Sequence, residues 1–320
     1  MQALVEITPW HWAGFIGFVL IFLSLDLGLI HRRARVVKFT EALGWTIVWV
    51  TLAVLFAAAL AFWRGRREAL EFFTGYFIEV SLSMDNVFVM ALIFAFFRVP
   101  AEYQHRVLFW GILGALIMRG VMIWLGIELI NRFDWLLYIF GAFLVLTGLK
   151  MLLSRSAGVR PEKNPVVRIA RKLFPISSHF DGQKFTTRLN GRQFLTPLFL
   201  VLLMVETTDL IFAFDSIPAI FGVTRKSFIV FTSNVFAILG LRSLYFVLAG
   251  AIGLFRYLKA GLSVVLVFIG VKMLIDPHEN PPQWYQADIS ITTSLLAVVI
   301  IIAVSILASI IAARRERANS

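Results

Sequence analysis

The sequence predicts an all-α membrane protein with nine transmembrane helices, which contain an inverted repeat of two three-helix units. Composition is the first reason: 59% of the 320 residues are hydrophobic, 15% are charged, and the mean hydropathy is +0.84. Soluble domains are about half apolar and about a quarter charged, so this chain requires lipid as its solvent. The second reason is the number of apolar runs of about 20 residues, the length that crosses the hydrocarbon core. The third is a repeated pattern of charges within those runs.

Nine apolar segments are expected to span the membrane, in order along the chain. The first lacks a basic leader and a small-residue cleavage site, so it is expected to remain as a helix and not to be removed as a signal peptide. Gly111, Gly114, Gly141 and Gly148 are expected to let helices approach closely. The polar segment 155–193 is too long for a tight turn and is expected to be partly helical. The nine segments are 10–30, 42–63, 71–97, 106–130, 135–153, 194–221, 228–251, 258–275 and 289–313.

Basic residues are distributed unevenly between the connecting segments. If the N-terminus is outside, the inner segments hold 20 Lys and Arg residues and the outer segments hold 6. Segment 155–193 holds nine of the 20, and without it the ratio is still 11 to 6. The positive-inside rule therefore predicts an outside N-terminus and a cytoplasmic C-terminus. Basic loops that face anionic lipid also explain the net charge of +11, so no nucleic-acid partner is expected.

Residue types exclude several classes of function. The chain has no cysteine, which excludes disulfides, iron–sulfur clusters and thiolate metal sites. It contains no nucleotide-binding glycine loop, catalytic triad or zincin motif. The chain is therefore expected to be neither an enzyme nor the carrier of a resident cofactor.

An internal repeat organises the charged residues. An acid, five intervening residues, a second Asp and a short polar side chain occur twice: Glu79, Asp85 and Asn86, then Asp209, Asp215 and Ser216. Each copy continues with a mid-helix arginine and a Gly-x-Lys-Met-Leu sequence: Arg119 and Lys150, then Arg242 and Lys272. Three helices per copy is an odd number, so the second copy enters the membrane from the opposite side, as in many secondary transporters. The expected units are 1–70 (two N-terminal helices), 71–154 (first repeat), 155–193 (cytoplasmic loop), 194–276 (second repeat) and 277–320 (last helix and tail).

Six acids lie within the predicted spans: Asp26, Glu79, Asp85, Glu206, Asp209 and Asp215. Each carboxylate in the bilayer centre costs about 2.5–3.5 kcal/mol, so these side chains are expected to face a protein interior or a wet cavity. The four intramembrane bases of the repeat are expected to neutralise them when the site is empty. Purely structural ion pairing is one interpretation. The excess of two acids favours the other, a net-negative pocket that attracts a cation.

Helical geometry groups these residues. Seven-residue spacing places Glu79 with Asn86, and Asp209 with Ser216, on shared faces. Asp85 lies about 240° from Glu79 around an ideal helix, so one ion requires either a helix break or ligands from facing helices. Pro218 predicts a break, because it lacks a donor and its ring clashes with the carbonyl four residues back, which belongs to Phe214.

The available ligands limit the cation. None of the five histidines lies in the middle of a predicted span, and there is no thiolate, so zinc, copper and iron are disfavoured. Carboxylate, amide, hydroxyl and backbone oxygens remain, which suit Mg²⁺, Mn²⁺, Ca²⁺ or protons. Met84 is interpreted as packing and not as a thioether ligand.

Three stretches resemble the TerC family, and in particular its Alx-type branch of bacterial inner-membrane proteins: Glu79-Val-Ser-Leu-Ser-Met-Asp-Asn-Val-Phe-Val, Glu206-Thr-Thr-Asp-Leu-Ile-Phe-Ala-Phe-Asp-Ser-Ile-Pro-Ala and Thr232-Ser-Asn-Val-Phe-Ala-Ile-Leu-Gly-Leu-Arg242. The resemblance extends from Asp26 to the last helix. It implies the wider LysE-like transporter group, Mn²⁺ efflux across the inner membrane, and an older association with tellurite resistance and pH response. A net-negative pocket should repel tellurite, which is an oxyanion. By position, the resemblance implies metal handling by Glu79, Asp85, Asn86, Glu206, Asp209 and Asp215, with Asp26 and Arg242 in supporting or gating roles.

The sequence therefore leads to the hypothesis of a secondary Mn²⁺ exporter with alternating access. Asp85 and Asp215 are expected to hold the ion between the third and sixth helices, with the other acids, Asn86 and Ser216 nearby. Proton exchange is a compatible coupling, because paired carboxylates can trade a divalent ion for protons. The alternatives are a transporter of Ca²⁺ or H⁺, and a membrane metal-delivery or assembly factor whose unidentified partners bind segment 155–193.

Overall fold

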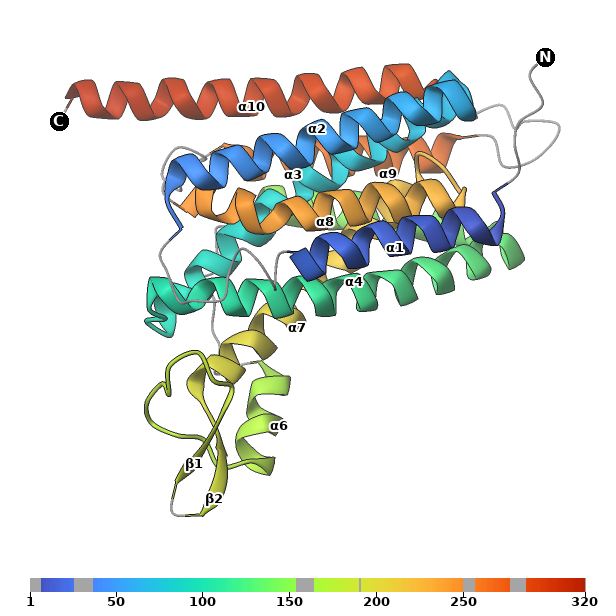
Figure 1. Ribbon diagram of the computed structural model, residues 1–320. Helices are drawn as coiled ribbons and strands as arrows, with labels where there is room; N and C mark the ends of the chain where they lie inside the picture. Colours follow the sequence, from blue (N-terminus) through green and yellow to red (C-terminus); the bar gives the residue numbers. More distant parts are fainter. Residues whose placement is uncertain are drawn as a thin grey trace.

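The computed structural model describes residues 7–25, 37–153, 164–189, 191–249, 257–276 and 286–319. These residues form ten helices and one short hairpin (Figure 1). The helices are α1 (Pro9–Leu25), α2 (Phe39–Trp63), α3 (Arg66–Phe96), α4 (Ala101–Arg132), α5 (Leu136–Leu153), α6 (Pro165–Leu173), α7 (Pro197–Phe221), α8 (Ser227–Ala249), α9 (Leu258–Ile275) and α10 (Ile291–Asn319). The strands are β1 (Thr186–Leu189) and β2 (Arg192–Leu195).

Eight helices in the described part of the chain are long and apolar enough to cross a membrane. They are α2, α3, α4, α5, α7, α8, α9 and α10, and their bounds fall close to the predicted segments. The first predicted span corresponds to α1, which is apolar but has only 17 described residues. The chain is thus a helical, multi-pass membrane protein, and a ninth span stays a prediction.

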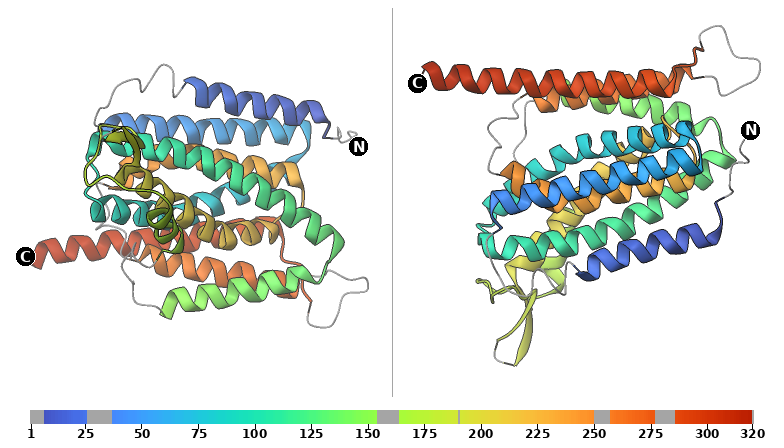
Figure 2. Two further views of the ribbon diagram at one scale, coloured as in Figure 1. Left: turned by 90° about the horizontal axis from the view of Figure 1, so that it is seen from below. Right: turned by 45° about the horizontal axis from the view of Figure 1, so that its top comes forward.

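The spanning helices lie side by side (Figures 1 and 2), and among them α3 packs against α7. These two run antiparallel, since Gly75 approaches Ile220 near one end and Asn86 bonds to Asp209 further along. Helix α8 packs on α3, and α4 packs on α7. The outermost helices, α2 and α10, expose most of their apolar surface, as helices that face lipid should. The centre of the bundle is therefore the place where polar side chains escape lipid.

Helices α5 and α9 pack with their backbones in close contact. A Cβ atom on Gly141 would lie 2.9 Å from the carbonyl oxygen of Gly270, and one on Gly148 would lie 2.8 Å from that of Ser263. Neither carbonyl could move without shifting a whole helix. The prediction that Gly141 and Gly148 allow close helix approach is therefore confirmed.

Segment 155–193 contains a helix, as expected, but it also contains strands. The Asn164 side chain accepts hydrogen bonds from the backbone N–H groups of Val166 and Val167 and so caps α6. Strands β1 and β2 pair antiparallel and project from the bundle beside the start of α7 (Figure 1). The predicted all-α class is confirmed for the bundle, and this hairpin is the one strand pair among the described residues. Its strands have only four residues each, too short for the alternation of a strand to stand out in the sequence.

The predicted break beside Pro218 is wrong. Helix α7 continues unbroken from Pro197 to Phe221 and so passes through Phe214. Pro218 lies in its last turn, where few later residues depend on the lost hydrogen bond. The neighbouring Ile217, Ala219 and Ile220 are all buried, so tertiary packing holds this turn in place.

Candidate functional site

One arginine, on α4, links α3 to α7. Arg119 of α4 is only 1% exposed, and its guanidinium forms a bidentate pair with Asp209 of α7: Nε lies 3.1 Å from Oδ2, and Nη2 lies 2.8 Å from Oδ1. Its Nη1 donates to Glu79 of α3 and, at 3.2 Å, to the hydroxyl of Ser216. We call Arg119, Glu79, Asp209, Ser216 and Asn86 the central polar network. Two carboxylates share one guanidinium, so the network has one more acidic than basic side chain.

The shared faces predicted for α3 and α7 are borne out in this network. The Nδ2 of Asn86 lies 3.4 Å from the Oδ1 of Asp209, so the amide joins the acid of the opposite helix. Antiparallel packing places Glu79 beside Ser216 and Asn86 beside Asp209. A charged group in the core requires a counter-charge and hydrogen bonds, and the planar fork of arginine supplies both to two acids at once.

Glu206 forms no ion pair with the basic side chains that the structure describes. Its carboxylate occupies the space beside Gly114 of α4, where even a Cβ atom would collide with it. Its Oε2 is buried and has no hydrogen-bond partner among the described residues. Asp209, three residues further along α7, is close enough to repel it electrostatically. The absence of a side chain at Gly114 is thus what makes room for Glu206 between α4 and α7.

Asp85 and Asp215 face helices α9 and α5 respectively. Both are half-buried. The positive charge that acts on Asp85 is Lys259 of α9. Asp215 accepts a hydrogen bond from the Thr147 hydroxyl and interacts with the charge of Lys150, both on α5. The structure therefore places each of these acids on the side of its helix that faces the α5–α9 pair.

The remaining predicted residues have different surroundings. Arg242 lies 3.3 Å from the Nε2 of His105 and lines a small cavity of about 10 Å³ beside Asp209. Lys272 is 4% exposed at the end of α9, within the electrostatic reach of Asp276 and Asp288. Asp26 lies outside the described residues.

The predicted acids do not form one compact cluster. Within the described residues, no group of three or more His, Asp or Glu side chains is placed so that it could hold a metal ion. Glu79 and Asp209 belong to the central polar network, Glu206 lies beside Gly114, and Asp85 and Asp215 face α9 and α5. A cation held by several of these acids therefore requires either a rearrangement or additional neutral ligands.

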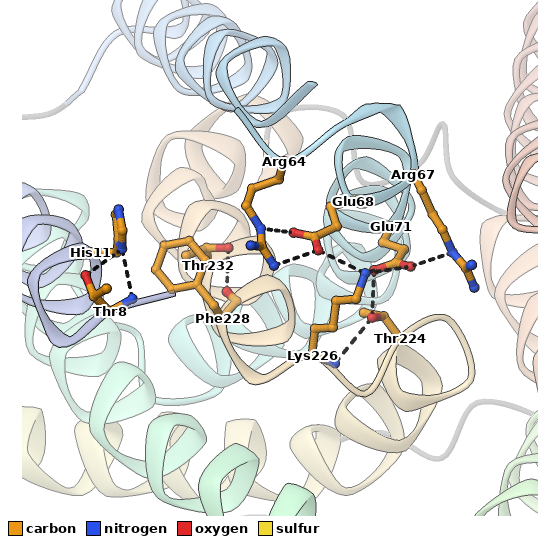
Figure 3. Close-up of polar contacts among 10 residues, drawn as sticks. All are labelled: Thr8, His11, Arg64, Arg67, Glu68, Glu71, Thr224, Lys226, Phe228 and Thr232. Atoms are coloured by element: carbon orange, nitrogen blue, oxygen red, sulfur yellow. Dashed lines mark hydrogen bonds and ion pairs between the residues drawn. The ribbon is translucent and has the colours of Figure 1, made fainter. Parts of the chain in front are cut away.

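A second charged group lies at the bundle end where α3 begins (Figure 3). Glu68 and Glu71 are buried, and Lys226, at the start of α8, lies 3.1 Å from the first and 3.2 Å from the second. Arg64 also pairs with Glu68, and the Thr224 hydroxyl donates to Glu71 at 2.9 Å. We call these five residues the end cluster.

The end cluster joins the α2–α3 turn to the α7–α8 turn and borders a pocket of about 270 Å³. Sequence analysis missed it because the predicted third span began only at residue 71. The available signal was the run of three arginines followed by two glutamates from 64 to 71, which no lipid-facing helix would carry.

The family described as "Integral membrane protein TerC family" matches residues 64–317. An uncharacterised membrane protein of Myxococcus xanthus is 53% identical over 308 residues, which cover 96% of this chain and 94% of that protein. A protein of Escherichia coli K12, provisionally named membrane-bound redox modulator Alx, is 51% identical over 279 residues, 84% of this chain and 86% of the relative. A membrane protein of Rickettsia bellii is 39% identical over 287 residues, 90% and 95% of the two chains. No solved structure matches.

Proposed function

The chain belongs to the TerC family of integral membrane proteins, and from this premise we propose that it is a secondary transporter that exports Mn²⁺ across the bacterial inner membrane. The observation that carries the proposal is the central polar network, in which two carboxylates share one guanidinium in the middle of a membrane bundle. Ionisable groups at such a depth are costly and in membrane proteins mark ion and proton pathways. A net-negative site of oxygen ligands attracts a hard cation.

Reciprocal helix contacts support an inverted repeat of units 71–154 and 194–276. The repeat equates Gly148 with Gly270, so Gly141 is equivalent to Ser263, seven residues earlier in each copy. The contact of Gly141 with Gly270 is then the symmetry mate of the contact of Gly148 with Ser263, and both are observed. Such self-matching contacts are expected across a two-fold axis. In transporters built this way, one unit rocks against the other around a central site.

In the proposed cycle, Arg119 is the internal counter-ion. It neutralises Glu79 and Asp209 while no cation is bound, and a divalent ion competes with it for these carboxylates. Asp85 and Asp215 supply the next acids, each within electrostatic reach of a lysine on α9 or α5. The end cluster would close one end of the bundle. Proton exchange is the coupling that these carboxylates allow.

Orientation is part of the proposal. The α2–α3 turn and the α7–α8 turn, both of which the basic-residue count places outside, meet at the end cluster. We assign the end with α6 and the β1–β2 hairpin to the cytoplasm and the end cluster to the outside. Export then means passage toward the end cluster.

The relatives' provisional name, redox modulator, is compatible with metal transport. This chain has no cysteine, so it offers no thiol–disulfide couple of its own. Manganese is a redox-active ion, and its export would change the redox balance of a cell without electron transfer by the protein. A role in redox or pH response would in that case be a consequence of transport.

The extramembrane segment of α6 and the hairpin favours a second candidate, a membrane metal-delivery or assembly factor. Basic residues concentrate there: Arg168, Arg171, Lys172, Lys184, Arg188 and Arg192. Under this candidate, deletion of residues 180–193 abolishes function in cells. Under the first, it spares Mn²⁺ transport by the purified chain.

The test is Mn²⁺ transport by purified protein in liposomes. We expect Asp85→Asn with Asp215→Asn, and separately Asp209→Asn, to abolish transport, because each removes a carboxylate from the proposed path. Asp181→Asn is the matched control, since this acid lies in the extramembrane segment and is exposed. Unimpaired Mn²⁺ transport by both groups of variants would falsify the assigned site. Replacement of Mn²⁺ by Ca²⁺, or by a pH gradient alone, separates the cation alternatives.

A further inference from the structure

Several buried polar atoms of α3 and α8 take no part in the ion pairs and hydrogen bonds described above. Glu79 Oε2, Ser83 Oγ and Asn86 Oδ1 of α3, and both amide atoms of Asn234 of α8, lack hydrogen-bond partners within the described part of the chain. Each of these four residues is at most 3% exposed. Buried polar side chains are nearly always bonded, so several unbonded ones in a single region call for an explanation.

Neighbouring polar residues on the same helices behave differently. On α3, Ser81 donates to the carbonyl of Phe77, as a serine in an apolar helix commonly does. On α8, the hydroxyls of Thr232 and Ser233 donate to backbone carbonyls of their own helix. Ser83 and Asn234 are thus exceptions within their own elements, and not examples of a general feature of these helices.

The three α3 residues share one face. Glu79, Ser83 and Asn86 follow the spacing of four and three residues that aligns side chains along a helix. The Asn86 amide group on this face reaches Asp209, so the face is turned toward α7 and the central polar network. The unbonded oxygens of Glu79, Ser83 and Asn86 therefore lie in the same buried region as Arg119.

Two contacts fix the level of Asn234 in the bundle. Its neighbour Ser233 lies against Gly75, one helical turn before Glu79 on α3. Phe231, one turn earlier on α8, lies against Gly120, which follows Arg119 on α4. Asn234 therefore lies at the depth of the Arg119–Glu79 pair, on a helix that packs against both α3 and α4.

We propose that Ser83 and Asn234, with the free oxygen of Glu79, are direct ligands of the transported divalent cation. The proposal rests on the transport function proposed above and names the neutral ligands of its site. Glu79 would bridge Arg119 through one oxygen and the cation through the other. One carboxylate with hydroxyl and amide oxygens is a hard, weakly charged ligand set, which suits Mn²⁺ or Mg²⁺ with bound water better than a soft metal.

A small cavity continues from this face toward the other end of the bundle. Met90, one turn beyond Asn86 on α3, lines it together with Asp209 and Arg242. Its volume of about 10 Å³ is the space that a single water or small ion takes. Asp209 borders both the ligand set and the cavity, so it is placed to pass the ion from one to the other.

The test is equilibrium binding of Mn²⁺ to the purified full chain, measured by calorimetry or by the electron paramagnetic resonance of free Mn²⁺. We expect Ser83→Ala and Asn234→Leu each to weaken Mn²⁺ binding about tenfold or more, since even loss of an indirect partner costs about 10–100-fold at a metal site. Ser81→Ala is the matched control: the same change on the same helix, at a hydroxyl that already has a partner. Its Kd should stay within about twofold of wild type.

Thermal unfolding separates a ligand from a structural residue. Ser83 and Asn234 make no hydrogen bond within the described residues, so Ser83→Ala and Asn234→Leu should melt at or above the wild-type temperature. Asn234→Asp, which adds a carboxylate at the site, should bind Mn²⁺ more tightly than wild type, and it carries the test if Asn234→Leu does not fold. Binding by Ser83→Ala and by the position-234 variants that equals the Ser81→Ala value overturns the ligand assignment alone. A wild-type chain that binds none of Mn²⁺, Mg²⁺ and Ca²⁺ overturns the transport function with it.

Discussion

At the scale of single residues, Arg119 determines the state of the site. It is fully buried and holds two acids from different helices through one planar guanidinium, which a lysine could not do with the same geometry. A buried ion pair contributes little net stability compared with apolar packing, but removal of one partner strands the other charge. Arg119 is therefore both the structural link between α3 and α7 and the group that a cation must displace or share.

This role predicts the effect of Arg119→Ala. The change leaves Glu79 and Asp209 buried without their counter-charge, so the protein should lose about 3–5 kcal/mol of stability. The loss is measured as a lower melting temperature and a lower yield of folded protein in detergent.

A matched control exists at the surface. Arg225 pairs with Asp134 at 3.0 Å, but both side chains are largely solvent-exposed. Arg225→Ala should therefore change stability by only about 0–1 kcal/mol. Equal losses for the two arginine variants would show that the central polar network is not a buried charge system.

At the scale of elements, α5 and α9 form the most extensive helix–helix contact among the described residues. Backbone meets backbone at Gly141 and Gly270, and again at Gly148 and Ser263. The same two helices carry Thr147, Lys150 and Lys259, the partners of Asp215 and Asp85. Any change in helix separation there would move these partners, so packing and charge are coupled in this pair.

The contact predicts a strong effect of one added methyl group. Gly141→Ala places a Cβ atom 2.9 Å from the Gly270 carbonyl oxygen, so α5 and α9 must separate, at a cost of about 1–3 kcal/mol. Gly44→Ala on α2 is the control: it meets nothing within 4 Å and should be neutral or stabilise by up to about 1 kcal/mol. The melting temperatures of the two variants measure this difference in stability. A Gly141→Ala variant as stable as Gly44→Ala would contradict the close packing of α5 and α9.

At the scale of the whole molecule, the bundle has two different ends. One carries α6 and the β1–β2 hairpin, where the Thr187 hydroxyl donates to Asp181 and holds the pKa of that carboxyl below its usual value. The other carries the end cluster, with Glu68 and Glu71 buried under Lys226 (Figure 3). Because the two ends differ, labelling a residue at each end can determine the orientation of the protein in the membrane.

The absence of cysteine makes labelling direct, because any introduced thiol is the single reporter. With the proposed orientation, Arg225→Cys at the end cluster should react with a membrane-impermeant thiol reagent added to intact cells. Gln193→Cys in the hairpin should react only after the membrane is permeabilised. The reverse pattern would refute the proposed orientation and with it the direction of export.

The sequence by itself determined the features that depend on local periodicity and on the cost of charge in lipid. Apolar runs of the right length located the spans, and seven-residue spacing placed Glu79 with Asn86, and Asp209 with Ser216, on shared faces. The prohibitive cost of lipid-facing carboxylates then required a protein interior for them. These inferences need only a single helix and a solvent.

Tertiary structure decided which side chains meet. Nothing local could tell that Arg119 would take both Glu79 and Asp209, that Glu206 would use the space left by Gly114, or that Asp85 and Asp215 would face other helices. Pro218 did not break α7, because buried neighbours hold the last turn in place. Helix pairing depends on contacts between residues far apart in the chain, and those contacts override local propensity. That is why the sequence located the charges and only the fold arranged them.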